Sequence, residues 1–120
     1  MRGLWPIEKA ALEAAIEDHP TLADGLRHQI AAARVASFEN TGAGFFSVLS
    51  VSSDAQAIAT RWPLDCAHGS VNRVEEAMGF LLYLNDGLLT ELEGYCLALE
   101  STTDIDFETV DFELRPYSAA

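Results

Sequence analysis

The chain has 120 residues, 49% of them hydrophobic and 22% charged, and its seven basic and nineteen acidic residues give a formal net charge of −12. This length and hydrophobic content predict a single folded domain over residues 1–120 and argue against intrinsic disorder. The acidic excess repels phosphate backbones and no apolar run reaches the length of a membrane span, so we expect no nucleic-acid partner and no membrane association.

The first residues and the cysteine content predict a cytoplasmic protein. Residues 1–6 lead directly into a charged helical pattern, without the apolar core of a signal peptide. Two cysteines are too few for a disulfide framework in a domain of this size. We therefore expect Cys66 and Cys96 to be reduced, and both to be buried.

The first predicted element is a helix that begins at Pro6, because proline suits the first helical position. It should end before His19-Pro20, since a residue that precedes proline is pushed out of the helical region. Its predicted core-facing stripe consists of Ile7, Ala11, Ala14 or Ala15, and Ile16. We expect Glu8, Glu13 and Glu17 to face water.

A second helix is predicted to run to about Ala32. Residues 21–24 resemble a capping box, with Asp24 in place of the usual glutamate. Leu22, Leu26 and Ile30 then repeat at four-residue spacing, which is typical of one helix face.

The pattern then changes to period two, which is typical of strands. We predict strands over residues 35–39, 45–51, 64–71, 79–84, 88–96 and 110–114, with one short helical turn at residues 53–56 before Trp62-Pro63. Residues 72–77 and 97–104 are predicted connections. The resulting class is α+β, with two N-terminal helices packed on one antiparallel, meandering β-sheet of five or six strands.

The strongest local signal is the hairpin around Asn85-Asp86-Gly87. A type I turn followed by a left-handed Gly87 predicts three pairs, Leu84 with Leu88, Leu82 with Thr90, and Phe80 with Leu92. A one-residue shift would bury two carboxylates among the leucines, which is costly. The predicted core face is Phe80, Leu82, Leu84, Leu88, Thr90, Leu92 and Cys96, and the opposite face is Leu81, Tyr83, Leu89, Glu91, Glu93 and Tyr95.

Four segments within residues 26–96 together resemble a family of small uncharacterised bacterial proteins. They are Arg34–Ser37, Thr41–Phe46, Gly79–Gly87 and Leu92–Tyr95. In that family a G-F-L-L-[YF]-[LV]-x-D-G strand pair ends in L-E-G-[YF]. Members often continue with an acidic tail that contains Pro-Trp, where this chain has residues 96–100 instead. The resemblance supports the fold and leaves the function open.

The hairpin side opposite the predicted core carries the candidate functional residues. Glu91 and Glu93 lie two apart on one strand and project from the same face, so with two tyrosines they suit acid–base chemistry or cation binding, or simply a solvated strand face. The leucines on the same side suit an interface. The candidate interface or ligand patch is Leu81, Tyr83, Leu89, Glu91, Glu93 and Tyr95.

Other motifs are weaker. Cys66 and His68 lie two apart on one predicted strand but lack an orienting residue for nucleophilic catalysis and two further ligands for zinc. The glycines of residues 41–44 suit a hairpin turn better than a phosphate loop. We therefore predict no catalytic residue, cofactor site or metal site.

Residues 74–114 contain eleven acidic residues and no Lys or Arg. This stretch favours a non-enzymatic protein-binding domain that docks a basic partner, as an immunity or inhibitor protein docks a toxin. The alternative is a small-ligand protein or enzyme with a pocket between the second helix and the sheet near Glu93, Tyr95 and Arg34. The apolar hairpin side also predicts a homodimer, weaker at low ionic strength because Glu91 and Glu93 would meet their own copies.

Overall fold

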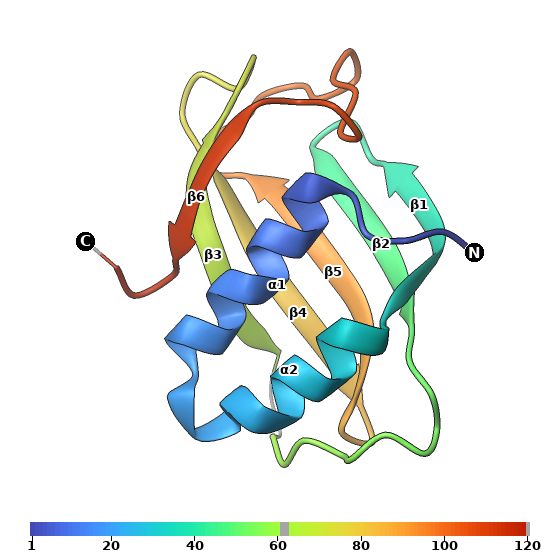
Figure 1. The fold of residues 1–120 in the computed structure, drawn as a ribbon. Coiled ribbons are helices and arrows are strands. Elements are labelled where there is room, and N and C mark those ends of the chain that lie inside the picture. Colours follow the sequence, from blue (N-terminus) through green and yellow to red (C-terminus); the bar gives the residue numbers. More distant parts are fainter. Residues whose placement is uncertain (61–62, 120) are drawn as a thin grey trace.

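The computed structural model describes residues 1–60 and 63–119. Within these residues, two helices precede six strands (Figure 1). The elements are α1 (Pro6–Asp18), the 3₁₀ turn η1 (Pro20–Leu22), α2 (Ala23–Ala32), β1 (Arg34–Asn40), β2 (Gly44–Ser50), β3 (Leu64–Val71), β4 (Met78–Asn85), β5 (Leu88–Cys96) and β6 (Phe112–Pro116). The predicted α+β class, with N-terminal helices and an antiparallel sheet, is confirmed.

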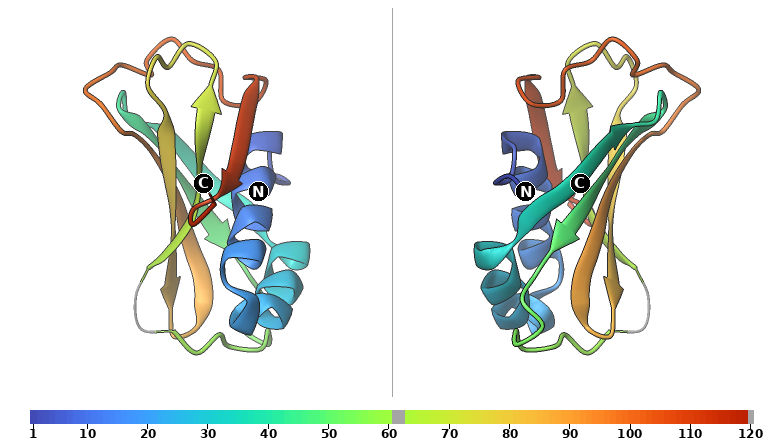
Figure 2. Two further views of the ribbon diagram at one scale, coloured as in Figure 1. Left: turned by 90° about the vertical axis from the view of Figure 1, so that its left-hand side faces the viewer. Right: turned by 90° about the vertical axis from the view of Figure 1, so that its right-hand side faces the viewer.

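The strand order is β1-β2-β5-β4-β3-β6, in one open sheet whose neighbours are all antiparallel. The sheet thus joins a β1–β2 hairpin to a β3–β4–β5 meander through the pairing of β2 with β5. Both helices lie on the same face of this sheet, and α1 packs against β3 and β6 (Figure 2). We call the helix side the inner face and the opposite side the outer face.

The helix boundaries follow the prolines. Pro6 occupies the first position of α1, and the helix ends at Asp18, as the His19-Pro20 pair predicts. The predicted cap at Thr21 is wrong, because residues 20–22 form a 3₁₀ turn and α2 begins only at Ala23. The expected helical turn at residues 53–56 is a hydrogen-bonded turn without a helix, and Trp62, its expected boundary, lies outside the described residues.

The turn of the β4–β5 hairpin is tighter than predicted. Asp86 and Gly87 have φ angles of 52° and 78°, and two such residues in succession form a type I′ turn. A bulge follows at Thr90, which has no ladder partner on β4. The strands therefore pair Asn85 with Leu88, Leu84 with Leu89, Leu82 with Leu92, and Phe80 with Gly94.

The three predicted pairs are wrong, yet most residues lie on their predicted faces. Phe80 lies opposite Gly94 rather than Leu92, a displacement of two residues, and side chains alternate with a period of two. The exception is the segment between the turn and the bulge, where the displacement is one residue. Leu89 consequently lies in the core, only 2% exposed, whereas Leu88 is half-buried.

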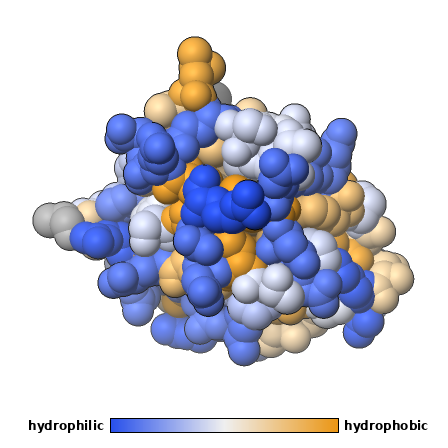
Figure 3. Space-filling model, turned by 90° about the horizontal axis from the view of Figure 1, so that it is seen from above, coloured by the Kyte–Doolittle hydropathy of each residue, from blue (hydrophilic) through white to orange (hydrophobic). Residues whose placement is uncertain are grey.

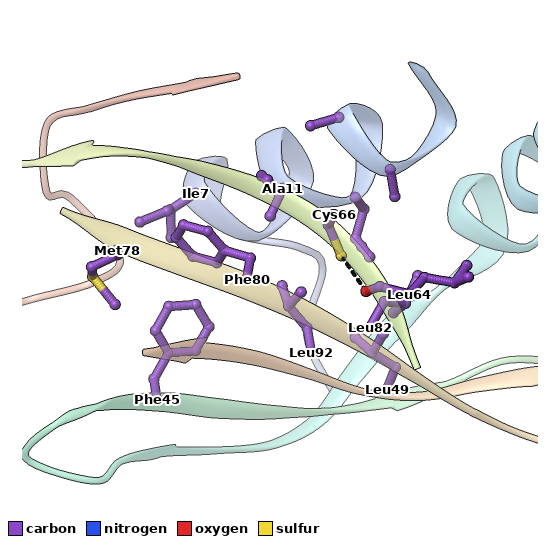
Figure 4. Close-up of a cluster of buried hydrophobic side chains, with 14 of the residues drawn as sticks. Ile7, Ala11, Phe45, Leu49, Leu64, Cys66, Met78, Phe80, Leu82 and Leu92 are labelled. Carbon is purple, nitrogen blue, oxygen red and sulfur yellow. Dashed lines mark hydrogen bonds between the residues drawn. The ribbon is translucent and has the colours of Figure 1, made fainter. Parts of the chain in front are cut away.

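The core lies between the inner face and the helices, and Figure 4 shows side chains from both meeting there. Phe45, Phe80 and Leu82 are fully buried. Gly94 is needed beside Phe45, because a Cβ on it would lie 2.6 Å from the Phe45 ring. The aromatic side chain thus occupies the volume that the glycine leaves free.

One buried amide fastens α2 to the hairpin. Gln29 is fully buried, and its side-chain nitrogen donates to the carbonyl oxygens of Gln56 and Gly87 at 2.8 and 2.9 Å. Its side-chain oxygen accepts from the Leu89 amide at 2.9 Å. Two backbone groups of the hairpin turn and one of the loop after β2 therefore receive a hydrogen-bond partner from the helix.

Candidate functional site

The outer face carries five of the six residues of the predicted patch. Leu81, Tyr83, Glu91, Glu93 and Tyr95 are all partly exposed there. The sixth, Leu89, is buried on the inner face, so its assignment to the patch is wrong. Pairing of β5 with β2 and of β4 with β3 adds Phe46, Val48 and Asp65 to the same surface.

Glu93 lies at the centre of this surface and is held by Tyr83. In the ladder it stands between Phe46 on β2 and Leu81 on β4. The Tyr83 hydroxyl donates a hydrogen bond of 2.8 Å to the Glu93 carboxylate. This bond, together with burial and the nearby negative charges, raises the pKa of Tyr83 to about 12. The carboxylate is thus fixed in orientation and remains accessible to a cation.

Tyr95 lies flat across a glycine of the neighbouring strand. A Cβ on Gly79 would lie 2.6 Å from the ring carbon and hydroxyl of Tyr95, so the ring covers the β4 backbone. Burial, followed by the negative charge of Asp65, raises the pKa of Tyr95. The ring therefore presents one aromatic face on the outer side of the sheet.

The three residues expected to form a ligand pocket do not converge. Glu93 and Tyr95 face away from both helices, whereas the predicted pocket lies between α2 and the sheet. Arg34 is exposed at the start of β1, opposite Ser50, and donates to the Met1 carbonyl oxygen at 3.3 Å. The predicted pocket near these residues is therefore wrong in its geometry.

A groove of about 740 Å³ lies elsewhere, between the end of α1, η1, the start of α2 and residues 56–59. Its charged side chains include Glu17, Asp24 and Arg27, of which the last two form an exposed ion pair at 3.3 Å. Exposed pairs of this kind contribute little free energy. The groove is lined by none of the six residues of the predicted patch and not by Arg34.

A second carboxylate of interest is Glu8, which the sequence placed in water but which lies in the core. Glu8 is 0% exposed, and its oxygens accept from both terminal nitrogens of Arg2 at 2.8 and 3.0 Å. They also accept from the Trp5 amide at 2.7 Å and from the Ser47 hydroxyl. The Arg2 guanidinium lies 3.4 Å over the Trp5 ring.

This cluster fastens the N-terminal segment to the inner face. One oxygen of Glu8 accepts from Arg2 and the Trp5 amide, and the other accepts from Arg2 and the Ser47 hydroxyl. Because both oxygens are paired, the carboxylate can be buried in the core. The sequence does contain a signal for this position. Glu8 lies three residues after Trp5, the residue that precedes the helix, and a glutamate at this spacing often accepts a hydrogen bond from the backbone amide of that preceding residue. Its role is structural.

Cys66 and His68 are not a pair. A bulge in β3 between Asp65 and Ala67 places Cys66 in the core, where its thiol lies 3.5 Å from the Leu64 carbonyl oxygen (Figure 4). Burial, followed by the nearby negative charges of Asp65 and Asp18, raises the pKa of the Cys66 thiol, so it is unreactive. His68 instead contacts the carbonyl oxygen of Ala119 at 3.1 Å.

Both cysteines are free, as predicted. Cys66 is buried, whereas Cys96 is only half-buried, so the expectation that both are buried holds for Cys66 alone. Within residues 1–60 and 63–119, no group of three His, Cys, Asp or Glu side chains has the arrangement of a metal site. No helix in this described part is long and apolar enough to cross a membrane.

The chain matches no protein-family model, and neither the curated proteins nor the solved structures contain a match to it. The resemblance to small bacterial proteins with the G-F-L-L hairpin therefore stays a prediction.

Proposed function

We propose that the chain is a non-enzymatic protein-binding domain, of the immunity or inhibitor kind, and that it docks a basic protein on the outer face of its sheet. The observation that carries the proposal is the composition of this face. Aromatic and aliphatic side chains alternate there with carboxylates, while the helices pack on the other side.

Charge complementarity favours a basic partner. Glu91 and Glu93 stand in adjacent outward positions of β5, and Asp65 and Glu39 extend the acidic surface to β3 and β1. The net charge of −12 adds a long-range field of the same sign. Such a field attracts cationic proteins and accelerates their association.

The aromatic residues supply the contacts that a charged surface lacks. Tyr83 and Tyr95 are half-buried and held by neighbours, so they lose little conformational freedom on binding. Tyrosine is enriched among residues that dominate binding energy, and its ring attracts Lys and Arg side chains. A basic side chain of the partner fits beside Glu93, between the two rings.

The predicted homodimer would use this same surface. Val48 and Phe46 add apolar area to it, but the burial of Leu89 removes one residue on which the dimer was predicted. A second copy would also bring Glu91 and Glu93 against like charges. We therefore choose a basic protein as the occupant, and a second copy is an outcome that the test below detects.

The test is affinity capture from cells of the native host with three immobilised proteins. These are the wild type, an outer-face variant (Glu91→Lys with Glu93→Lys), and a helix variant (Glu13→Lys with Glu17→Lys) that changes the charge equally on exposed positions of α1. The wild type and the helix variant should retain one basic protein that the outer-face variant loses. The purified pair should then bind more weakly in calorimetry as salt rises.

Two results contradict the proposal. Equal loss of the captured protein from both variants means that net charge alone attracts it. Light scattering that finds a stable dimer of the purified wild type, abolished only by the outer-face variant, assigns the surface to a second copy.

A further inference from the structure

The loop that follows β5 carries two large apolar side chains that are exposed to solvent. We call residues Leu97–Leu99 the leucine loop. Leu99 is 107% exposed and Leu97 is 57% exposed, with Ala98 exposed between them. Figure 3, a view from above, shows a hydrophobic group that projects from the rim of the molecule. A single exposed leucine is ordinary, but three consecutive apolar residues on a projecting turn are not.

The leucine loop is fastened at both ends. The Leu97 amide donates to the Ala77 carbonyl oxygen at 3.0 Å. On the far side, the Glu100 carboxylate accepts from the amides of Glu75 and Glu76 at 2.7 and 3.0 Å. Hydrogen bonds to an ionised acceptor are about twice as strong as those between neutral groups. The projection of the leucines into solvent is therefore set by the loop's anchors and not by packing of the leucines themselves.

The loop is continuous with the outer face. β5 carries Glu91, Glu93 and Tyr95 and passes directly into residues 97–99. Both views of Figure 2 show the connection after β5 extending to the side of the sheet that is opposite the helices. One partner seated on the outer face therefore also meets the leucines.

From these contacts we infer that Leu97 and Leu99 are the apolar anchor of the interface, and that they insert into an apolar pocket of the basic partner. The inference rests on the proposed function and names the residues that hold the complex together. A loop whose backbone is already held in its binding position loses less conformational entropy on association than a mobile one. Such anchors, surrounded by polar contacts, dominate the energy of many interfaces.

The two parts of the surface then have different roles. The carboxylates of β5 act at a distance and set the association rate, which salt screens. The leucines act only in contact and set the dissociation rate, which is independent of salt to first order. Replacing both leucines by serine should therefore weaken binding by about 30-fold or more at every salt concentration.

The experiment places a photo-crosslinking amino acid at one of three exposed positions, Leu99, Val48 on the outer face, or Ala31 on α2. Each protein is illuminated in lysate of the native host, with and without excess unlabelled competitor. We expect positions 99 and 48 to crosslink to the same basic protein and position 31 to give none. Unlabelled wild type should prevent the crosslink, and unlabelled Leu97→Ser with Leu99→Ser should fail to do so.

The outcomes separate the two proposals. A crosslink from position 48 without one from position 99 overturns the anchor and leaves the outer face as the binding surface. No specific crosslink from either position overturns both. A crosslink from position 99 to a second copy of this chain contradicts the proposal that the partner is a different, basic protein. Because the leucine side chains lie in solvent, the serine variant should melt with the wild type, which excludes misfolding as a cause.

Discussion

Two glycines of the β4–β5 hairpin make the same contact on opposite faces of the sheet. Gly94 leaves room for the Phe45 ring on the inner face, and Gly79 leaves room for the Tyr95 ring on the outer face. Phe45 is fully buried beneath the helices, whereas Tyr95 is half-exposed beside Asp65. The same local device therefore closes a core on one side and presents an aromatic surface on the other.

The carboxylates repeat this contrast. Glu8 is fully buried on the inner side and has partners from three other residues. Glu93 is half-exposed on the outer side and accepts from Tyr83. The free energy of folding therefore depends on the carboxylate of Glu8, whereas the carboxylate of Glu93 is available for a partner. The first three predictions below each compare one inner residue with its outer counterpart, and the fourth tests the outer tyrosine–glutamate bond.

The largest difference is expected between two adjacent leucines of β4. Leu82 is fully buried, so Leu82→Ala should lower the free energy of unfolding by about 2–5 kcal/mol through lost burial and a residual cavity. Leu81 is partly exposed on the outer face, and Leu81→Ala should cost less than about 1.5 kcal/mol. Urea denaturation of both variants measures this, and equal losses would show that the outer face is also covered.

A smaller difference separates the two glutamates. Glu8→Ala removes charge-assisted hydrogen bonds from the core and should cost about 2–3 kcal/mol, since Arg2 is 29% exposed and can return to water. Glu93→Ala should stay within about 0.5 kcal/mol, as surface changes usually do. Thermal and chemical denaturation should agree on this order. A reversed order is incompatible with the assigned environments.

The glycines should differ by less. Gly94→Ala overpacks the ring of a buried phenylalanine and should cost about 1–3 kcal/mol. In Gly79→Ala the tyrosine ring can swing into solvent, and the gain in strand propensity offsets the loss, so we expect a change below about 1 kcal/mol. Melting temperatures test this pair, with near-equal shifts as the contradicting result.

The smallest effect is a titration. The pKa of Tyr83 is raised to about 12 mainly by its hydrogen bond to Glu93, so Glu93→Gln should lower it toward 10 in an ultraviolet titration, with Tyr83→Phe identifying the signal. The folded state holds this proton more tightly than the unfolded state. Its stabilising contribution is therefore fully present below about pH 10 and is lost as pH rises through 12. If the pKa of Tyr83 is the same in the glutamine variant and the wild type, the hydrogen bond to Glu93 is not the cause of the shift.

The sequence predicted elements better than their partners. Pro6 and Pro20 fixed the ends of α1, and Asp86-Gly87 marked the hairpin turn, because these residues act through local backbone geometry. The pairing of β2 with β5 joins residues more than forty positions apart, and no local signal encodes it. The prediction of the hairpin register was wrong because the same turn sequence suits a two-residue and a three-residue loop.

The burial of polar side chains was also not predicted from the sequence. A glutamate or glutamine in a helix is expected in water, so neither Glu8 nor Gln29 was assigned to the core. The partners of Gln29 that permit its burial, Gly87 and Leu89, are distant in sequence. Glu8 combines the nearby Arg2 and Trp5 with the distant Ser47. The outer-face patch was predicted except at Leu89, where a bulge changed the face.

The packing of α1 has a consequence for the order in which the domain is completed. This helix is made before any strand, yet it packs on β3 and β6, and its final residue Asp18 accepts hydrogen bonds from the backbone and hydroxyl of Ser118. During synthesis the β6 side of α1 can be covered only after about a hundred further residues have been made, some 5–20 s at usual elongation rates. The contacts of α1 with β6 are therefore among the last that can form.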